Sequence, residues 1–258
     1  MPVASVSVSA DPTVQFLLRL GDTCLIHGQR TAEWCGHAPV LEEDIALSNM
    51  ALDLIGQARA VLSLAGSLHA PALDEDQLAF LRDERDYRNP TIVELPRGDF
   101  AFTVLRNTLM ATFMRLLWER LVSSPNEDLA GIAGKAVKEA RYHQQHAADW
   151  LVRLGDGTEE SHARCVVALD RLWPYTAELF DDDAVDAAAE ASGLGPRSSA
   201  LQAAWLAELQ AILDEATLKA PPSGAFRSTG KRGLHSEHMG FLLAGMQHLQ
   251  RSFPGGVW

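Results

Sequence analysis

The stretch from residue 41 to residue 66 constrains the fold more than any other part of this sequence. Its apolar residues recur at steps of three and four positions, and they are Leu47, Met50, Ala51, Leu54, Ala58, Val61, Leu62 and Ala65. This spacing predicts a long helix with one face in a hydrophobic core. A second, polar line runs beside that face and consists of Asn49, Asp53, Gly56 and Gln57. The helix therefore brings a carboxylate next to buried surface, where the carboxylate requires a partner.

Three other long helices are predicted before and after this one. The first opens with Asp11 as N-cap and Pro12 at the first helical position, and it extends to about Trp34. The third covers about residues 99–123 and the fourth about residues 127–154. A crossover with two prolines and a glycine joins the two helix pairs and is predicted to lie on the surface. Because this is the order of a ferritin-like bundle, we predict an all-α, ferritin-like helical bundle with extra C-terminal helices.

We expect one structural domain preceded by a short leader. Residues 1–11 have neither a basic start nor an apolar run, so they are predicted to be a flexible leader and not a signal peptide. Residues 12–258 are predicted to form a single ferritin-like helical domain. Its four-helix core is expected at about 12–155, and additional helices are expected at 157–258. A chain of 258 residues is long enough to bury a core of this size.

Charge and cysteine content argue against several classes of function. The formal net charge is -12, which opposes the phosphate neutralisation that nucleic-acid binding requires. Cys24, Cys35 and Cys165 show no paired spacing, so neither a disulfide framework nor a structural zinc site is indicated. The sequence has no apolar run of about 18 residues that would span a membrane. We therefore predict a cytoplasmic protein that binds neither nucleic acid nor a membrane.

Polar residues on the four long helices are spaced like the ligands of a di-metal bundle. Such a bundle takes one carboxylate from each of two helices and a Glu-x-x-His pair from each of the other two. The corresponding positions are Asp22, Asp53 and Gly56 in the first half and Asn107, Glu139 and Tyr142 in the second half. Glycine and tyrosine replace both histidines, and an amide replaces one carboxylate. We interpret the six positions as vestigial, and we predict no metal, cofactor-binding or catalytic residue in this chain.

Two other interpretations of the carboxylates stay open. One is an independent di-iron or di-manganese oxidase whose ligands are Asp22, Asp53 and Glu139. His143 is a further candidate ligand of that site. A shifted site would use Glu139, His143 and His146 instead. The other is a polar core layer without metal, in which hydrogen bonds or nearby cations neutralise the carboxylates. The candidate cations are Arg106, Lys135 and Lys138.

The C-terminal part combines a linker rich in glycine, proline and basic residues (221–233) with a final amphipathic helix. His235 and His238 are three positions apart, but no third ligand accompanies them, so they are a weak metal site. We predict instead a docking surface for a partner, formed by Lys231, Arg232, His235 and His238.

Four long stretches resemble a known family. They are WCGHAPVLEEDIALSNMALDLIGQAR, FLRDERDYRNPTIVELPRGDFAFTVLRN, VKEARYHQQHAADWLVRLGDGTEES and TGKRGLHSEHMGFLLAGMQHLQR, and the resemblance covers about residues 12–258. The family is the structural, non-catalytic C subunit of bacterial phenylacetyl-CoA ring 1,2-epoxidases. The resemblance implies a ferritin-like fold that has lost its iron ligands, which is consistent with Gly56, Asn107 and Tyr142.

The same resemblance implies partners and cofactors outside this chain. The partners are a paralogous catalytic A subunit with the di-iron centre that epoxidises the CoA-activated ring, a small B subunit, and a reductase component. The reductase carries flavin and a 2Fe-2S cluster and uses NADPH. The chain is thus expected to pair with its catalytic paralogue and stabilise it in aerobic phenylacetate degradation, without activity of its own. An independent oxidase is the alternative, and a helical binding module unconnected with oxygen chemistry is a third, weaker one.

Overall fold

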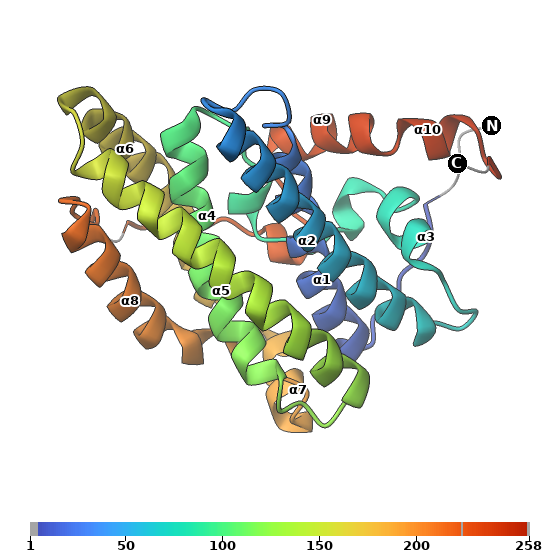
Figure 1. Cartoon of the computed structure of the whole chain (residues 1–258). Helices are drawn as coiled ribbons and strands as arrows, with labels where there is room; N and C mark the ends of the chain where they lie inside the picture. The colour runs from blue at the N-terminus through green and yellow to red at the C-terminus, as the bar shows by residue number, and fades with distance from the viewer. Residues whose placement is uncertain (1–4, 223, 257–258) are drawn as a thin grey trace.

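Four long helices form the centre of the molecule (Figure 1). The computed structural model describes residues 5–222 and 224–256. The four helices are α1 (Pro12–Ala32), α2 (Leu41–Ser67), α4 (Phe100–Leu121) and α5 (Glu127–Gly155). Helix α1 packs along α2, α4 packs along α5, and α2 also contacts α5. The predicted all-α, ferritin-like bundle is confirmed, and within the described residues the only β-type pairing is an isolated bridge between Thr229 and Leu234.

Side-chain caps explain where these helices begin. Asp11 accepts a hydrogen bond from the Thr13 amide at 2.8 Å, which confirms the predicted N-cap of α1. Asp99 and Asn126 each accept from the amide three residues later, and they begin α4 and α5 in the same way. Each cap satisfies an amide that has no partner inside its own helix.

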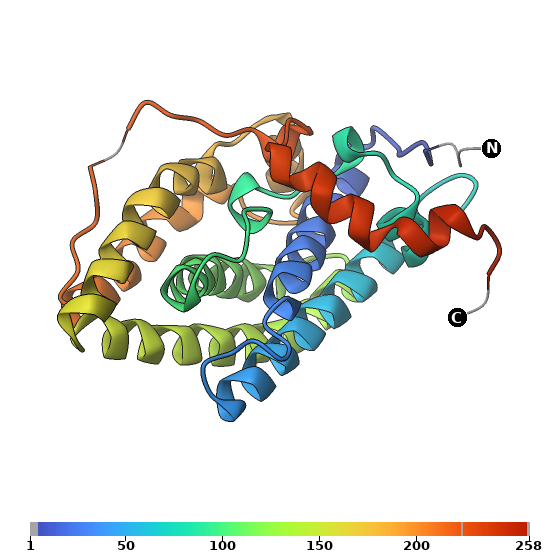
Figure 2. The ribbon, with the colours of Figure 1, turned by 90° about the horizontal axis from the view of Figure 1, so that it is seen from above.

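Helix α4 lies in the middle of the fold. Seen from above, α1 and α2 lie on one side of it, α5 runs along another, and α6 (Glu159–Leu172) and α8 (Gln202–Glu215) lie on the side away from α1 (Figure 2). Helix α4 contacts α5, α6 and α8. Leu105, Leu109 and Trp118 are fully shielded from solvent. Buried residues lie on every side of α4, which makes it the core helix of the fold.

The middle of the crossover, residues 89–95, is buried, so its predicted surface position is wrong there, whereas Arg85, Pro96 and Gly98 are exposed. It contains α3 (Glu75–Phe80) and two short 3-10 helices, η1 (Glu84–Asp86) and η2 (Thr91–Val93). All three residues of η2 are buried. The C-terminal segment 228–236 covers η2 and hydrogen-bonds with groups beside it. Proline and glycine mark an irregular path for the chain, but they do not report what lies on top of it.

The additional helices pack around the four-helix core. Besides α6 and α8, they are η3 (Trp173–Phe180), α7 (Ala184–Ser192), η4 (Ser198–Leu201), η5 (Gly230–Arg232), α9 (Glu237–Met246) and α10 (His248–Ser252). Helix α7 contacts α1, and α9 contacts η1. Among the helices of the described residues, none is both long and apolar enough to cross a membrane.

The described part of the predicted leader lies against the fold. The Val6 amide donates a hydrogen bond to the carbonyl of Leu81 at 3.0 Å. The Ser5 hydroxyl donates to the Asp86 carboxylate at 2.9 Å. The rest of that leader, residues 1–4, lies outside the described residues.

Candidate functional site

Four polar side chains meet in the middle of the four-helix core. They are His27 of α1, Gln57 of α2, Asn107 of α4 and His143 of α5, and we call them the core polar layer. Their exposed fractions are only 5–6%. Together with apolar neighbours such as Met50 they line a cavity of about 20 Å³. A cavity of that size holds about one water molecule.

The contact between α1 and α4 in this layer is neutral. His27 Nε2 donates a hydrogen bond to Asn107 Oδ1 at 2.8 Å. Burial, and then the nearby Arg106 guanidinium, lower the pKa of His27 to about 3, although the hydrogen bond to Asn107 acts in the opposite direction. The imidazole is therefore uncharged at neutral pH, and the hydrogen bond selects the tautomer that is protonated on Nε2.

The contacts between α2 and α5 place two carboxylates at the edge of the layer. His143 Nε2 donates to Asp53 Oδ2 at 3.0 Å, and Gln57 Nε2 donates to Glu139 Oε2 at 2.9 Å. Burial lowers the pKa of His143 in spite of Asp53 and Glu139. The Asp53 side chain is 37% exposed and that of Glu139 is 17% exposed. Both carboxylates therefore keep contact with solvent, which reduces the cost of their charge.

Gly56 and Tyr142, at the predicted histidine positions, face solvent. Tyr142 is 52% exposed, and a Cβ atom on Gly56 would meet no atom within 4 Å. The buried pairs with the same spacing lie one position later in each helix and are Leu54 with Gln57 and Ala140 with His143. Because a helix turns by about 100° per residue, a shift of one position selects a different face. The register taken from the sequence therefore differs by one residue from the register that faces the core.

Asp22 belongs to a different cluster. It is fully buried and forms an ion pair with Arg82 of the crossover, with Nη1 and Oδ2 3.0 Å apart. The Arg88 amide donates to the same carboxylate oxygen at 2.8 Å. The six predicted positions thus divide between this ion pair, the core polar layer with its edge, and the solvent-facing side of α2 and α5.

The cations expected near these carboxylates lie in different places. Lys135 Nζ is 3.4 Å from Glu139 Oε1, which is one of the expected pairs. Arg106 is buried, and it donates to the carbonyl of Leu95 at 2.7 Å. Lys138 is exposed on α5. Asp22 is thus neutralised by none of the three cations that the sequence suggested, because the crossover brings Arg82 to it.

Lys231, His235 and their neighbours use much of their polar surface within this chain. Lys231 is buried, and its ammonium donates to the carbonyl of Asp181 at 3.1 Å. Arg232 is 44% exposed and pairs with the Asp181 carboxylate at 2.9 Å. His238 is half-buried at the start of α9. Of the four residues predicted to dock a partner, Arg232 is therefore the most exposed.

Two buried glutamates hold the C-terminal segment against the rest of the fold. Glu94 accepts a hydrogen bond from Nδ1 of His235 at 2.7 Å. Glu178 accepts one from the Ser228 hydroxyl at 2.6 Å and one from the Lys231 amide at 2.8 Å. Both carboxylates lie in the buried part of the molecule, with exposed fractions of 0% and 1%. This segment is therefore anchored by charge-assisted hydrogen bonds.

His27, Gln57 and Arg82 were not among the residues predicted from the sequence to form the site. A signal existed for Gln57, which ends the polar line beside the apolar stripe of α2. No local signal existed for Arg82, because its partner Asp22 is 60 residues away along the chain. His27 has no spacing rule of its own either, and only the packing of α1 on α4 makes it a member of the layer.

The core polar layer does not fit a di-iron centre. Iron ions in such bundles are bridged by several carboxylates, and each is completed by a histidine. The two usual ligands in the layer are His27 and His143, and both have Nε2 engaged in hydrogen bonds. In the part of the chain that the structure describes, no three His, Cys, Asp or Glu side chains are grouped so as to hold a metal.

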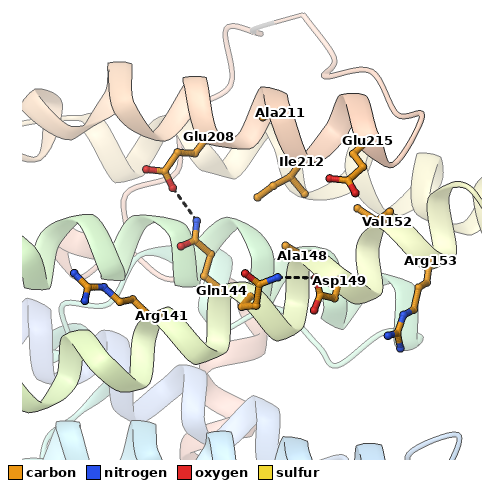
Figure 3. Close-up of a pocket in the computed structure, with 11 residues that line it drawn as sticks. Arg141, Gln144, Ala148, Asp149, Val152, Arg153, Glu208, Ala211, Ile212 and Glu215 are labelled. Carbon is orange, nitrogen blue, oxygen red and sulfur yellow. Dashed lines mark hydrogen bonds between the residues drawn. The ribbon is translucent and has the colours of Figure 1, made fainter.

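A larger hollow lies on another face of α5, between α5 and α8 (Figure 3). Its volume is about 820 Å³, and its walls carry two arginines and three acidic residues. Gln144 Nε2 donates to Glu208 across it at 2.9 Å, and Arg141 pairs with Glu119 at 2.9 Å. Since charges of both signs line the walls, the hollow selects neither an anionic nor a cationic ligand.

Comparison with known proteins adds two findings. The family model described as phenylacetic acid catabolic protein matches residues 4–258. The chain is also 49% identical over 243 residues to the C subunit of the 1,2-phenylacetyl-CoA epoxidase of Escherichia coli (strain K12). That alignment covers 94% of this chain and 98% of the relative. Both findings agree with the resemblance carried by the four long stretches.

Proposed function

Because the chain belongs to the phenylacetic acid catabolic protein family, we propose that it is a non-catalytic subunit of a phenylacetyl-CoA 1,2-epoxidase complex. In this role it pairs with a di-iron catalytic paralogue and stabilises it during aerobic phenylacetate degradation. A small B subunit and a reductase with flavin, a 2Fe-2S cluster and NADPH complete the complex. The observation that carries the proposal is the 49% identity to the C subunit of the E. coli epoxidase over nearly the whole of both chains.

The chemistry of the core polar layer supports a role without metal. The inward positions of α2 and α5 hold Leu54, Gln57 and Ala140 beside His143, so an apolar or amide group stands at three of these four places. Asn107 and His27 pair with each other, and both are neutral. The two carboxylates that reach the layer, Asp53 and Glu139, are engaged by His143 and Gln57, and two carboxylates are fewer than a di-iron centre takes from such a bundle.

Co-production with the catalytic paralogue tests the proposal. The paralogue is made with and without this chain, and both its soluble yield and its phenylacetyl-CoA epoxidation, with the B subunit and reductase added, are measured. We expect soluble, active paralogue only when this chain is present, because pairing shields surface that is otherwise exposed. A paralogue that is equally soluble and active alone would refute the stabilising role.

Metal content separates the proposal from an independent oxidase. The chain is made alone, incubated anaerobically with Fe(II), freed of loose metal and assayed for iron and manganese. We expect near-zero metal, and the same result for Asp53→Ala and Glu139→Ala variants that still fold. About two ions per chain, lost in either variant, would identify a di-metal site and contradict the non-catalytic role.

A further inference from the structure

A pocket of about 490 Å³ lies between η3, α8 and the linker that follows α8. Its walls include Trp173 and Phe180 of η3, Trp205 of α8 and Phe226 of the linker. Residues 224–227 of the linker are all exposed and lie at the outer edge of the fold in the view of Figure 2. Pockets of about 300–1,000 Å³ are large enough to hold a small-molecule ligand.

Aromatic rings give this pocket an apolar wall. Trp205 is 1% exposed, and its Nε1 donates a hydrogen bond to the carbonyl of Leu109 at 3.0 Å, which fixes the ring. The ring centroid of Phe180 lies 5.1 Å from that of Trp205, and the ring centroid of Trp173 lies 6.0 Å from it. Phe226 completes the wall and is 50% exposed. Fixed rings beside an exposed ring favour a ligand that is itself aromatic, because aromatic pairs attract one another beyond the area they bury.

Arg227 brings a positive charge to the same pocket. Its side chain is exposed, and Nη1 donates to the carbonyls of Gly224 at 2.9 Å and Phe226 at 2.7 Å. In the part of the chain that the structure describes, no carboxylate pairs with Arg227. Asp181 also lines the pocket, but it pairs with Arg232 at 2.9 Å. The linker therefore holds the guanidinium by one nitrogen and leaves Nε and Nη2 for an acceptor from outside the chain.

The aromatic wall and the guanidinium together define the class of ligand. A planar guanidinium binds a carboxylate through two parallel hydrogen bonds, and such charge-assisted pairs are stronger than neutral ones. We propose that this pocket binds a small aromatic carboxylate, with its ring against the aromatic wall and its carboxylate on Arg227. The proposal uses groups of this chain alone, so it does not depend on the proposed function.

An NMR titration of the full chain with phenylacetate tests the site. Phenylacetate is a suitable probe because one aromatic ring and one carboxylate are its only functional groups. We expect saturable shifts of the Trp173 indole N–H signal, with a Kd of about 1 mM or lower. Phenylacetamide has the same shape without the charge, and acetate has the charge without the ring. Each should bind about tenfold more weakly, or weaker still, since each lacks one of the two contacts.

Two substitutions with matched controls separate the two contacts. Arg227→Gln should weaken phenylacetate binding about tenfold or more and leave phenylacetamide binding nearly unchanged, because the change removes only the charge. Phe226→Ala should weaken the binding of both probes, because it removes part of the aromatic wall. The controls are Arg85→Gln and Phe241→Ala, which change exposed residues outside the pocket and should leave binding unchanged. All four side chains are exposed, so each variant should fold, as circular dichroism can verify.

Three results would overturn the proposal. The first is a Trp173 signal that does not respond to phenylacetate up to about 10 mM. The second is equal affinity for phenylacetate and phenylacetamide, which would mean that the carboxylate makes no contact. The third is phenylacetate binding that survives Arg227→Gln. The proposed function fails by a different result, which is a paralogue that needs no help from this chain.

Discussion

Two regions of the molecule bury polar groups by different means. The core polar layer joins straight helices through neutral side chains, and its carboxylates Asp53 and Glu139 stay at the solvent-facing edge. The crossover region instead buries three carboxylates completely or almost so, on Asp22, Glu94 and Glu178. We call these three the buried anchors.

The difference follows from the backbone around each region. In a long helix the backbone amides are paired with carbonyls of the same helix, so a buried carboxylate there depends on side-chain donors or on amides from another part of the chain. The crossover and the C-terminal segment are irregular, and their amides need other acceptors. The anchors provide them: Asp22 accepts the Arg88 amide, and Glu178 accepts those of Thr91 and Lys231. The three anchors therefore accept hydrogen bonds from irregular chain, whereas the core polar layer pairs side chains of straight helices.

Loss of Arg82 should have the largest effect. Arg82→Ala leaves the Asp22 carboxylate buried without its cation, and we expect the free energy of unfolding to fall by about 3–5 kcal/mol. Urea unfolding measures the loss. The double variant Asp22→Leu with Arg82→Met should recover most of it, because no charge is left unpaired. If Arg82→Ala were as stable as the natural chain, Asp22 would be hydrated. The contrast between the core polar layer and the buried anchors would then not hold.

Removal of one anchor charge should cost less. Glu178→Gln turns an acceptor into a donor in front of the Thr91 amide and the Ser228 hydroxyl, so we expect a loss of about 1–3 kcal/mol. Hydrogen exchange should show faster opening of segment 228–236, with α2 unaffected. Equal changes in both places would mean that the anchor supports the whole fold and not its C-terminal segment.

Acid should destabilise the core polar layer. The pKa of His27 is about 3 in the folded protein and about 6.5 when unfolded, so below pH 6.5 the unfolded chain takes up the proton first. Stability from this group is complete above pH 6.5, and about 2 kcal/mol of it is lost by pH 5. Urea unfolding of His27→Gln should show a shallower loss between pH 6.5 and 5. An NMR titration of His27 near pH 6 would contradict its burial.

The histidine beside an anchor should respond with the opposite sign. His235 contacts Glu94 through Nδ1 and the carbonyl of Tyr87 through Nε2 at 3.1 Å, so both nitrogens carry protons. Burial by itself lowers the pKa of His235, but Glu94 raises it more, and the net pKa is raised. Its contribution to stability is complete below about pH 6.5 and is lost as pH rises through the raised value. His235→Gln should remove this loss of stability at alkaline pH, measured by urea unfolding. If the pH dependence of the free energy of unfolding did not change, His235 would not be charged in the folded protein.

Loss of the edge cation should have the smallest effect. The side chain of Lys135 is 78% exposed, so its pair with Glu139 is screened by water. We expect Lys135→Ala to change the free energy of unfolding by less than about 1 kcal/mol. A loss as large as that of Arg82→Ala would show that Glu139 is a buried anchor too, and the distinction between the two regions would disappear.

The sequence predicted the helical elements well because their signals are local. The N-cap at Asp11 was confirmed. The crossover was placed on the surface because Pro90, Pro96 and Gly98 are common in surface loops, yet this segment is covered by chain from more than a hundred residues later. No pattern in a short window carries that information.

The vestigial-ligand interpretation shows the same limit on a finer scale. Spacing placed six candidate positions on the four long helices, but a one-residue difference in register turns a side chain by about 100°. Asp53 and Gly56 therefore lie at the edge and outside, whereas Leu54 and Gln57 face the core. Which face of a helix is buried depends on the neighbouring helices that pack against it, and this packing is a property of the tertiary structure.

The sequence by itself determined the helical class, the order of the bundle helices and the family to which the chain belongs. These follow from periodicity, caps and long stretches of similar residues, all of which are properties of contiguous chain. The tertiary structure alone decided which polar groups meet, such as Asp22 with Arg82 and Glu94 with His235. Those pairs join residues 60 and 141 positions apart, and only the packing of helices and crossover brings them within hydrogen-bonding distance.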